Sequence, residues 1–371
     1  MSTAPRPPVP MAGFQPDPSA DRNLVTVADF ERAAATTLPP GPLAYYAGGA
    51  MDERTLADNL AAFRRRRLVP RVMRDVAAVD TSTTILGRRW PLPLWVAPTA
   101  LQRMAHPDGE LATARAARAR GLTFGLSTSA STDMAEVAAL GGPRWYQVYL
   151  LADPGARRAM VERAVACGYE ALVLTVDLQR LGRRERDIRV GFAIPPGVHL
   201  PNIARAAGVA DADAPQVPFI ASLRWEHLEW LAGFGLPVLV KGVLHPDDAR
   251  AAVERGAAGV VVSNHGGRQL DGAVASVDAL KAVVDAVNGR APVLLDGGVR
   301  RGGDVLVALA LGAAAVGVGR PALWGLAVDG ERGVGRVLDL LAAEFELALA
   351  LSGMASVRDV DLGLLAPGDR G

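Results

Sequence analysis

From Leu94 onward, eight short apolar runs alternate with segments long enough to form helices. This alternation is typical of repeated βα units around a parallel sheet. An open doubly wound sheet usually has about five or six parallel strands, so eight repeats favour a closed barrel. We therefore predict an α/β fold with a single (β/α)8 TIM barrel. The expected strands are Leu94–Ala97, Thr123–Leu126, Trp145–Tyr149, Ala171–Val176, Val238–Lys241, Gly259–Ser263, Val293–Asp296 and Ala315–Val318, and the clearest helices are Gly109–Arg120, Gly155–Ala166 and Pro246–Arg255.

Two segments fall outside the repeat. Residues 24–93 precede the first expected strand and predict an N-terminal helical extension, whereas Leu178–Arg224 separates the fourth strand from its helix. A connection of that length is either functional or disordered, and we interpret it as a lid over the site. The expected domains are a flexible Pro-rich tail at 1–23, one domain at 24–360 that contains the barrel from about 94, and a C-terminal tail at 361–371.

The composition excludes several classes of protein. With 40 Lys and Arg against 39 Asp and Glu, the net charge is +1, so the charge balance does not favour a nucleic-acid partner. Half of the residues are hydrophobic, which is too apolar for a disordered chain. Charges, glycines or prolines interrupt every apolar run before the roughly 18 residues needed to span a bilayer. We therefore expect a soluble protein with no membrane partner. The single cysteine, Cys167, excludes an internal disulfide framework, which favours a reducing, cytoplasmic compartment.

Polar residues gather where the expected strands end, and enzymes with this fold bind their ligands at that end of the barrel. After the seventh and eighth strands the chain carries Gly297, Gly298 and Arg300, then Gly319 and Arg320. Glycine lets backbone amides approach a phosphate, and arginine neutralises its charge. These turns predict a phosphate site, although tight βα turns with solvated arginines would give the same pattern.

Among the five histidines, only His265 directly follows a strand in a Gly-rich loop, which makes it the candidate base. His106 and His245 each precede a proline at the start of a helix, and His199 and His227 fit surface or packing roles. The sequence contains no motif with metal-ligand spacing, so we expect no bound metal.

Charged residues lie at other strand ends. Asp177 ends the fourth strand, where it either orients His265 or caps a helix. Lys241 ends the fifth strand and is either a cofactor-facing cation or a solvated lysine. Arg184 opens the long connection, and Arg268 follows His265 by three residues. A guanidinium fork matches a carboxylate, so these two arginines suggest a small carboxylic acid as substrate.

Several segments together carry a resemblance to a known family. The most specific is SNHGGRQLDG at 263–272. The others, in order, are YYAGGAMDERTLADN (45–59), APTALQRMAHPDGE (97–110), QVY (147–149), LTVD (174–177), LGRRERD (181–187), LVKGV (239–243) and LDGGVRRGGDVLVALALGA (295–313). From about 24 to 357 the chain resembles the FMN-dependent (S)-2-hydroxy-acid oxidase and dehydrogenase family, which includes glycolate oxidase, lactate oxidase and mandelate dehydrogenase.

The resemblance implies FMN as the cofactor and a role for each matching residue. It assigns His265 as the active-site base and Asp177 as its paired carboxylate, with Tyr149 close to the substrate hydroxyl and the flavin. Lys241 would lie beside flavin N1 and O2 and favour the anionic reduced ring. Tyr45, Arg268 and Arg184 would hold the substrate carboxylate. The residues that would bind FMN are Ala97, Pro98, Thr99, Ala100, Ser127, Gln147, Thr175, Ser263, Asp296, Gly298, Arg300, Gly319 and Arg320. The last five of these would contact the ribityl chain and the phosphate.

The implied reaction oxidises an (S)-2-hydroxy acid to a 2-oxo acid, and oxygen would accept the electrons to give hydrogen peroxide. Ala100 resembles the oxidases and favours oxygen, while a quinone or carrier protein is the alternative acceptor. Ser129 stands where glycolate oxidase has tryptophan, so a larger pocket predicts an aromatic, mandelate-like or medium-chain acid over lactate or glycolate. Family members commonly form homotetramers or homo-octamers, and we expect one of these.

Two other functions remain as alternatives at this point. One is another FMN barrel enzyme, the type 2 isopentenyl diphosphate isomerase, and the other is a flavin-binding sensor or scaffold. The combination of Tyr45, Arg184, His265 and Arg268 argues against both.

Overall fold

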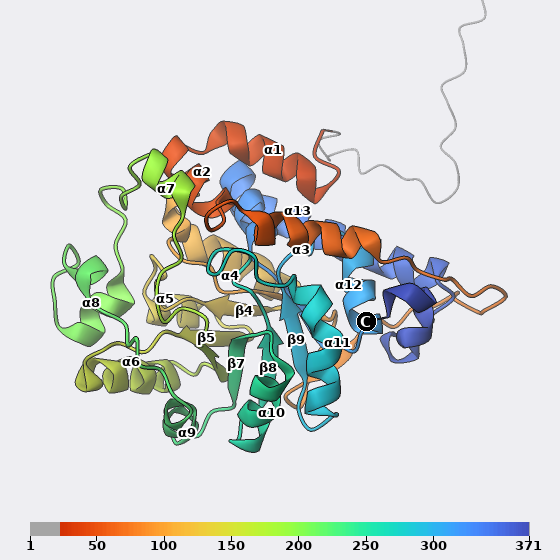
Figure 1. Ribbon diagram of the computed structural model, residues 1–371. Coiled ribbons are helices and arrows are strands. Elements are labelled where there is room, and N and C mark those ends of the chain that lie inside the picture. Colours follow the sequence, from red (N-terminus) through yellow and green to blue (C-terminus); the bar gives the residue numbers. More distant parts are fainter. Residues whose placement is uncertain (1–22, 371) are drawn as a thin grey trace, which may run out of the picture.

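Eight parallel strands close into a barrel in the computed structural model, which describes residues 23–370 (Figure 1). Each strand pairs with the next along the chain, and β10 closes the ring on β3. The predicted TIM barrel is confirmed, and every predicted strand lies within two residues of an observed one. The barrel strands are β3 (Leu94–Val96), β4 (Thr123–Leu126), β5 (Arg144–Val148), β6 (Ala171–Thr175), β7 (Val238–Val243), β8 (Gly259–Val262), β9 (Val293–Asp296) and β10 (Ala315–Val318).

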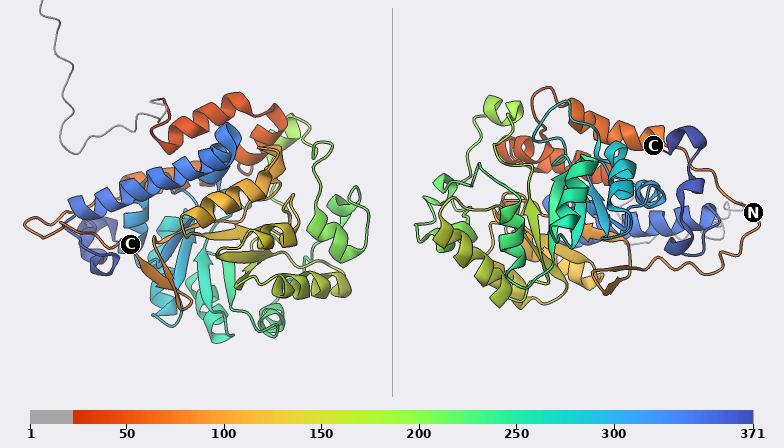
Figure 2. Two further views of the ribbon diagram at one scale, coloured as in Figure 1. Left: turned by 180° about the vertical axis from the view of Figure 1, so that it is seen from behind. Right: turned by 60° about the horizontal axis from the view of Figure 1, so that its bottom comes forward.

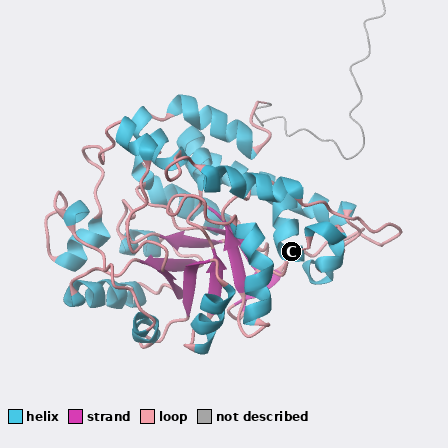
Figure 3. Cartoon of the chain, viewed as in Figure 1, coloured by secondary structure: helices cyan, strands magenta, loops and turns pink. Residues whose placement is uncertain are grey.

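Helices surround these strands on the outside (Figure 3). Local signals explain where several of them begin: Asp153 and His245 each accept a backbone hydrogen bond at a helix N-cap, and a proline follows each of them. His245 therefore has the helix-start role that the sequence predicted. The helices after successive strands are α4 (Gly109–Ala119), α5 (Met134–Ala139), α6 (Pro154–Ala166), α9 (Glu226–Ala232), α10 (Pro246–Glu254), α11 (Ser276–Val287), α12 (Gly302–Ala310) and α13 (Arg320–Leu351), with a 3-10 turn at Gln102–Met104 before α4.

Tryptophans fill the interior of the barrel. Trp95 of β3 is fully buried, and an added Cβ at Gly125 or Gly317 in the flanking strands would come within 3 Å of its ring. A hairpin that the sequence did not predict, β1 (Thr83–Ile85) and β2 (Arg88–Trp90), supplies Trp90, whose ring centroid lies 5.4 Å from that of Trp145 at the start of β5. The hairpin therefore closes the amino end of the barrel and leaves the carboxyl end for ligands.

The predicted N-terminal helical extension consists of α1 (Val27–Thr37), α2 (Pro40–Ala47) and α3 (Arg54–Arg65), which lie together with α13 at the top of Figure 1. Val27, Phe30 and Ala34 form the buried stripe of α1, at the spacing of one helix face, and α1 packs along α13. Because α3 contacts α11, this extension reaches the loops that follow the last barrel strands.

The long connection after β6 is folded. It contains α7 (Glu185–Arg189), α8 (Pro201–Ala207) and a 3-10 turn at Ala214–Gln216, and α8 packs against α6 at the side of the barrel (Figure 2). Leu178, Leu181, Arg184 and Phe219, near its two ends, line the cavity described below. The ends of the connection therefore contribute to the site, whereas its middle does not cover it.

Residues 361–370, which belong to the predicted C-terminal tail, pack against the body of the protein. Leu364 and Leu365 are buried, and backbone hydrogen bonds join Val69 to Leu364 and Ala366 to Arg67. Short 3-10 turns occur at Val357–Asp359, Leu362–Leu364 and Pro367–Asp369. The predicted Pro-rich tail lies almost entirely outside the described residues and stays a prediction. From 23 to 370, no helix is long and apolar enough to cross a membrane.

Candidate active site

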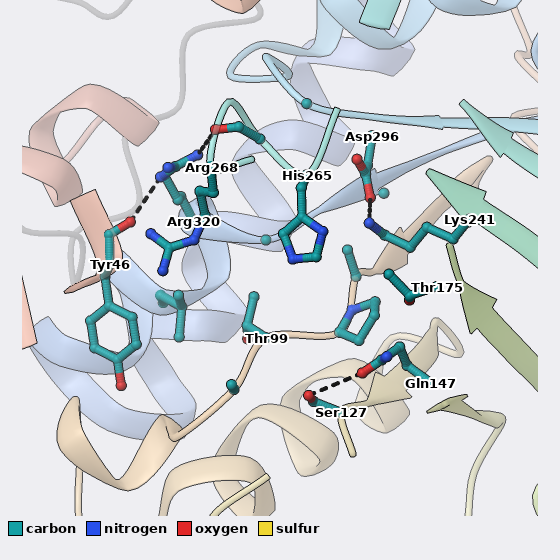
Figure 4. A pocket seen from close by; sticks show the side chains of 18 of the residues that line it. Tyr46, Thr99, Ser127, Gln147, Thr175, Lys241, His265, Arg268, Asp296 and Arg320 are labelled. Atoms are coloured by element: carbon teal, nitrogen blue, oxygen red, sulfur yellow. Dashed lines mark hydrogen bonds and ion pairs between the residues drawn. The ribbon is translucent and has the colours of Figure 1, made fainter. Parts of the chain in front are cut away.

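One cavity at the carboxyl ends of the barrel strands brings together nearly all residues predicted for the site (Figure 4). Of those predicted residues, Asp177 and Ser263 do not line the cavity, but each is hydrogen-bonded to a residue that does. The predicted residues that line it are Tyr45, Ala97, Pro98, Thr99, Ala100, Ser127, Ser129, Gln147, Tyr149, Thr175, Arg184, Lys241, His265, Arg268, Asp296, Gly298, Arg300, Gly319 and Arg320.

His265 and Asp177 form a hydrogen-bonded pair beside this cavity. The Nδ1 atom of His265 lies 2.8 Å from Oδ1 of Asp177, and its Nε2 lies 3.3 Å from the hydroxyl of Tyr149. A carboxylate at Nδ1 favours the tautomer with its proton on that nitrogen, which leaves Nε2 as an acceptor. Asp177 therefore pairs with the histidine, and no helix begins at it.

Burial and charge set the protonation of these three groups. Burial lowers the pKa of His265, because Asp177 offsets the loss of water only in part, while Lys241 and Arg184 add positive charge. Burial alone would raise the pKa of Asp177, but His265 and Lys241 hold it below its ordinary value. Burial and Asp177 raise the pKa of Tyr149. Near neutral pH the site therefore has an ionised Asp177 and a neutral His265 that is able to accept a proton.

The loop after β8 holds His265 in a left-handed backbone conformation. Its φ angle is 60°, and Gly266 and Gly267 follow with 65° and 74°. An added Cβ at Gly267 would lie 2.6 Å from the backbone nitrogen of Leu56 in α3, so only glycine fits there. The amide of Ala50 donates to the Gly267 carbonyl at 2.8 Å. The N-terminal helices therefore fix the loop that carries the base.

Lys241 is a buried cation held by two partners. Its Nζ donates to Ser263 Oγ at 3.0 Å and lies 3.2 Å from Asp296 Oδ2. Ser263 Oγ in turn donates to Asp296 and accepts from the backbone amide of His265 at 3.0 Å. Burial alone would lower the pKa of Lys241, but Asp296 and Asp177 raise it above its ordinary value. The interpretation of Lys241 as a solvated lysine is therefore wrong.

Two arginines and a tyrosine form the polar side of the cavity toward α2. The guanidinium carbons of Arg268 and Arg184 lie 4.9 and 5.8 Å from the ring centroid of Tyr45. One Nη atom of Arg268 donates to the carbonyls of Tyr45 and Gly48. Burial and the nearby Arg184 lower the pKa of Arg268 to about 10. Asp187 lies close enough to raise the pKa of Arg268, but this pKa still stays below its ordinary value, and within residues 23–370 neither arginine forms an ion pair. This corner is therefore suited to an anion.

Polar atoms without partners mark a second part of the cavity. Ser127 donates to Oε1 of Gln147 at 3.1 Å, and the amide of Thr128 lies 3.2 Å from the same atom. Gln147 Nε2 and Thr175 Oγ1 are buried and have no hydrogen-bond partner among the described residues. Because unpaired buried polar groups are costly, these two atoms indicate a bound polar ligand.

A third part of the cavity lies at the loops after β9 and β10. Gly298 has a φ angle of 95°, and an added Cβ would lie 2.2 Å from the carbonyl oxygen of Asn59, so only glycine lets this loop pack against the backbone of α3. Arg320 donates to the carbonyls of Tyr46, Gly48 and Gly266. Burial lowers the pKa of both Arg300 and Arg320, and the pKa of Arg320 falls well below its ordinary value. An anion such as phosphate would relieve this cost.

Several structural residues of the site were not recognised from the sequence. The amides of Asn59 in α3 and Asn264 after β8 pair reciprocally at 2.8 Å, 205 positions apart. Glu110 of α4 is fully buried and accepts from the backbone amides of Gln102 and Ser131 at 3.0 and 2.8 Å. Phe219 lines the cavity from the far end of the connection after β6. Asn59 and Glu110 lie within segments that carried the resemblance, but no sequence signal indicated Phe219. Within the described part of the chain, no three His, Cys, Asp or Glu side chains gather to hold a metal ion.

Comparison with known proteins defines the family. The profile described as FMN-dependent dehydrogenase matches residues 34–367. The chain belongs to this family. It is 48% identical to a lactate oxidase of Nostoc sp. (92% of this chain, 98% of the relative), 49% to glycolate oxidase 3 of Arabidopsis thaliana (91% and 94%) and 46% to human 2-hydroxyacid oxidase 1 (92% and 96%).

Solved structures extend the relationship to mandelate oxidase. A variant of mandelate oxidase with (S)-mandelic acid superposes with a TM-score of 0.86 at 45% identity and covers 92% of this chain and 98% of that one. A mandelate oxidase structure with benzoyl-formic acid has a TM-score of 0.85 at 46% identity, with the same coverage. The protein is therefore an FMN-dependent oxidoreductase of the 2-hydroxy-acid oxidase family.

The cavity fits FMN, the cofactor of this family. The unpaired atoms of Gln147 and Thr175 offer hydrogen bonds to a polar ring or chain, and Gly298 lines the same cavity. The buried arginines Arg300 and Arg320 suit a phosphate.

Proposed function

We propose that the protein oxidises an (S)-2-hydroxy acid to the corresponding 2-oxo acid and passes the electrons to oxygen, which is reduced to hydrogen peroxide. The observation that carries this proposal is the joint position of a neutral base and an anion site. His265 presents Nε2 to the cavity, and Arg268 and Arg184 line the same cavity. A 2-hydroxy acid has a carboxylate and an adjacent hydroxyl, which match these two features.

The substrate carboxylate binds Arg268 and Arg184 beside Tyr45, because these buried guanidiniums have the charge and the free N–H groups for it. The hydroxyl then faces Tyr149 and His265. His265 accepts a proton from the substrate at Nε2, and the Asp177 carboxylate at Nδ1 stabilises the imidazolium that forms. Bound FMN supplies the two-electron acceptor of this reaction.

FMN would be held along the cavity by the residues that the resemblance assigned. Gln147, Thr175, Ser127 and the segment 97–100 would contact the ring and ribityl region. Gly298, Arg300, Gly319 and Arg320 would hold the phosphate at the ends of β9 and β10. Lys241 stays charged between Asp296 and Asp177, so it would stabilise negative charge on the reduced cofactor.

We propose an aromatic, mandelate-like or medium-chain acid as the substrate. Ser129 supports this choice, because a small side chain lines the cavity at the position where glycolate oxidase carries tryptophan. The similarity to mandelate oxidase crystallised with (S)-mandelic acid points the same way. The 48% identity to a lactate oxidase favours a small acid instead, so that substrate is the second candidate.

Oxygen is the proposed acceptor, since Ala100 lines the cavity and the curated relatives compared above carry oxidase names.

We further propose a cytoplasmic homotetramer or homo-octamer. Apolar side chains that face solvent support assembly: Val72 and Met73 on the loop after α3, with 81% and 99% exposure, and Leu351 at the end of α13 with 70%. Light scattering of the purified protein measures this directly.

Anaerobic flavin absorbance tests the proposed reaction. (S)-Mandelate and, in parallel, (S)-lactate are added to the FMN-loaded protein, and air follows. Rapid bleaching by mandelate alone and return of the colour with one equivalent of peroxide are expected. Bleaching without recovery in air would identify a dehydrogenase, and bleaching by lactate alone would identify the small-acid enzyme. The His265→Gln variant should keep FMN and lose bleaching, and normal bleaching would reject the base assignment.

A further inference from the structure

Two aromatic residues of the connection after β6 pack on Tyr45 and Tyr149, two of the tyrosines that line the cavity. The ring of Phe192 stacks on Tyr45 with centroids 4.9 Å apart and an angle of 20° between the ring planes. The ring of Phe219 packs against Tyr149 at 5.1 Å with an angle of 45°. Aromatic pairs at these distances contribute beyond their buried area. Phe192 lies in the first half of this connection and Phe219 in the second, so the same connection packs against both tyrosines.

Phe219 is the one of these two phenylalanines that lines the cavity itself. Its position is fixed by a short antiparallel bridge to the segment that follows Tyr149. The amide of Ile220 donates to the Leu150 carbonyl and the amide of Ala152 donates to the Pro218 carbonyl, both at 2.8 Å. Because both residues that flank Phe219 are bonded to this segment, the backbone that carries the phenyl ring is fixed relative to Tyr149.

The loop that carries Ser129 is fixed to the same connection. Asn202 of α8 is buried, donates to the Thr132 carbonyl at 3.0 Å and accepts from the Met134 amide at 2.8 Å. From the other side, the buried carboxylate of Glu110 accepts from the amide of Ser131 at 2.8 Å. Ser129 and Phe219, which both line the cavity, are thus held through one folded segment.

We propose that Phe219 is a specificity-determining residue, a fixed wall against which the side chain of the 2-hydroxy acid packs. The proposal rests on the proposed function and deepens it. Serine at 129 leaves space in the cavity, and the phenyl ring at 219 offers an apolar aromatic surface to a substrate that fills this space. A phenyl or medium-chain group gains from this surface, whereas a methyl group buries too little area to gain much.

The experiment compares the binding of two 2-oxo acids to the oxidised holoenzyme, followed through the change in flavin absorbance. Benzoylformate carries a phenyl group and pyruvate a methyl group. Phe219→Ala should weaken benzoylformate binding about tenfold and change pyruvate binding less than about twofold, because the wall serves only the larger group. The KM for mandelate should rise in parallel with the dissociation constant for benzoylformate.

Phe234→Ala is the matched control. Phe234 is equally half-buried and packs on Trp230, with Arg158 over its ring, but it does not line the cavity. Both dissociation constants should stay at the wild-type values in this variant. If Phe219→Ala fails to retain FMN, Phe219→Leu replaces it; this variant keeps an apolar side chain and should weaken benzoylformate binding about threefold and leave pyruvate unchanged.

Equal effects on both oxo acids, or none, in the Phe219 variant would overturn the specificity role. The same holds if Phe234→Ala shows the same selective loss. These binding measurements need no turnover. A wild-type protein that binds benzoylformate but is bleached by no 2-hydroxy acid would therefore overturn the proposed reaction alone, and one that binds neither oxo acid would overturn both.

Discussion

The imidazole of His265 lies between Asp177 Oδ1 at 2.8 Å and the hydroxyl of Tyr149 at 3.3 Å, and it uses a different ring nitrogen for each. The carboxylate occupies Nδ1, so Nε2 is the nitrogen available to a substrate. Gly242 allows this arrangement, because an added Cβ there would lie 2.6 Å from Cγ of Asp177. The base is therefore oriented by its neighbours before any substrate binds.

The pH dependence of kcat/KM should report this pair. His265 must be neutral to accept a proton, and burial places its pKa below the ordinary value of 6.5. Activity should therefore fall as the pH drops through a pKa below 6.5 and stay level above it. Asp177→Asn removes a charge that raises this pKa, so the acid limb should shift to lower pH, while kcat falls by about 10²- to 10⁴-fold. An acid limb that moves to higher pH in this variant would contradict the pairing.

Arg268→Lys tests the carboxylate site. Lysine keeps the charge but loses the planar fork, so KM for the hydroxy acid should rise about 10- to 100-fold with a smaller change in kcat. Steady-state kinetics measure both values, and Tm shows whether the contacts of Arg268 with the Tyr45 and Gly48 carbonyls matter for folding. Arg183→Lys is the control, because Arg183 is largely exposed. A normal KM in Arg268→Lys would show that the carboxylate binds elsewhere.

Lys241→Met removes the buried cation with little change in volume. The flavin midpoint potential should fall and anaerobic reduction should slow by about tenfold or more, because no positive charge then stabilises the reduced cofactor. Spectroelectrochemistry and stopped-flow absorbance measure the two effects. Lys281→Met changes the only other lysine of the chain, on the outer helix α11, and should affect neither. An unchanged potential in Lys241→Met would remove the proposed role.

Ser129→Trp should reduce the space for the substrate side chain. The ratio of kcat/KM for lactate to that for mandelate should increase at least about tenfold, since an indole fills the volume a phenyl group would need. Ser129→Ala keeps the side chain small and should leave the ratio within about twofold of the wild-type value. If the tryptophan variant keeps the original preference, other residues set the size of the pocket.

The sequence was sufficient to predict the barrel and several residues that lie at the candidate site, because both depend on local patterns. Apolar runs of strand length at regular spacing predicted each barrel strand, and His265, Asp177 and Lys241 could be found because each directly follows or ends such a run. The barrel geometry then places all strand ends on one face, so residues far apart in sequence converge without further information.

The contacts that support the site could not be predicted in this way. The pairing of Asn59 with Asn264 spans 205 positions, and nothing near either residue specifies the other. The hairpin that carries Trp90 was missed because its strands have three residues each, too short for a periodic signal. Phe192 and Phe219 lie in a segment without regular periodicity, so only the folded chain shows that they back the two tyrosines.

The attachment points of the connection after β6 also indicate where this enzyme tolerates change in length. Phe192 packs on α2, and Asn202 and the backbone beside Phe219 are bonded to the loops after β4 and β5, but residues 208–213 between Asn202 and Phe219 are all exposed. A peptide tag or a small domain inserted there would leave all three anchors in place, since exposed loops accept insertions most readily. The same stretch is where relatives with different partners could diverge in length while keeping one active site.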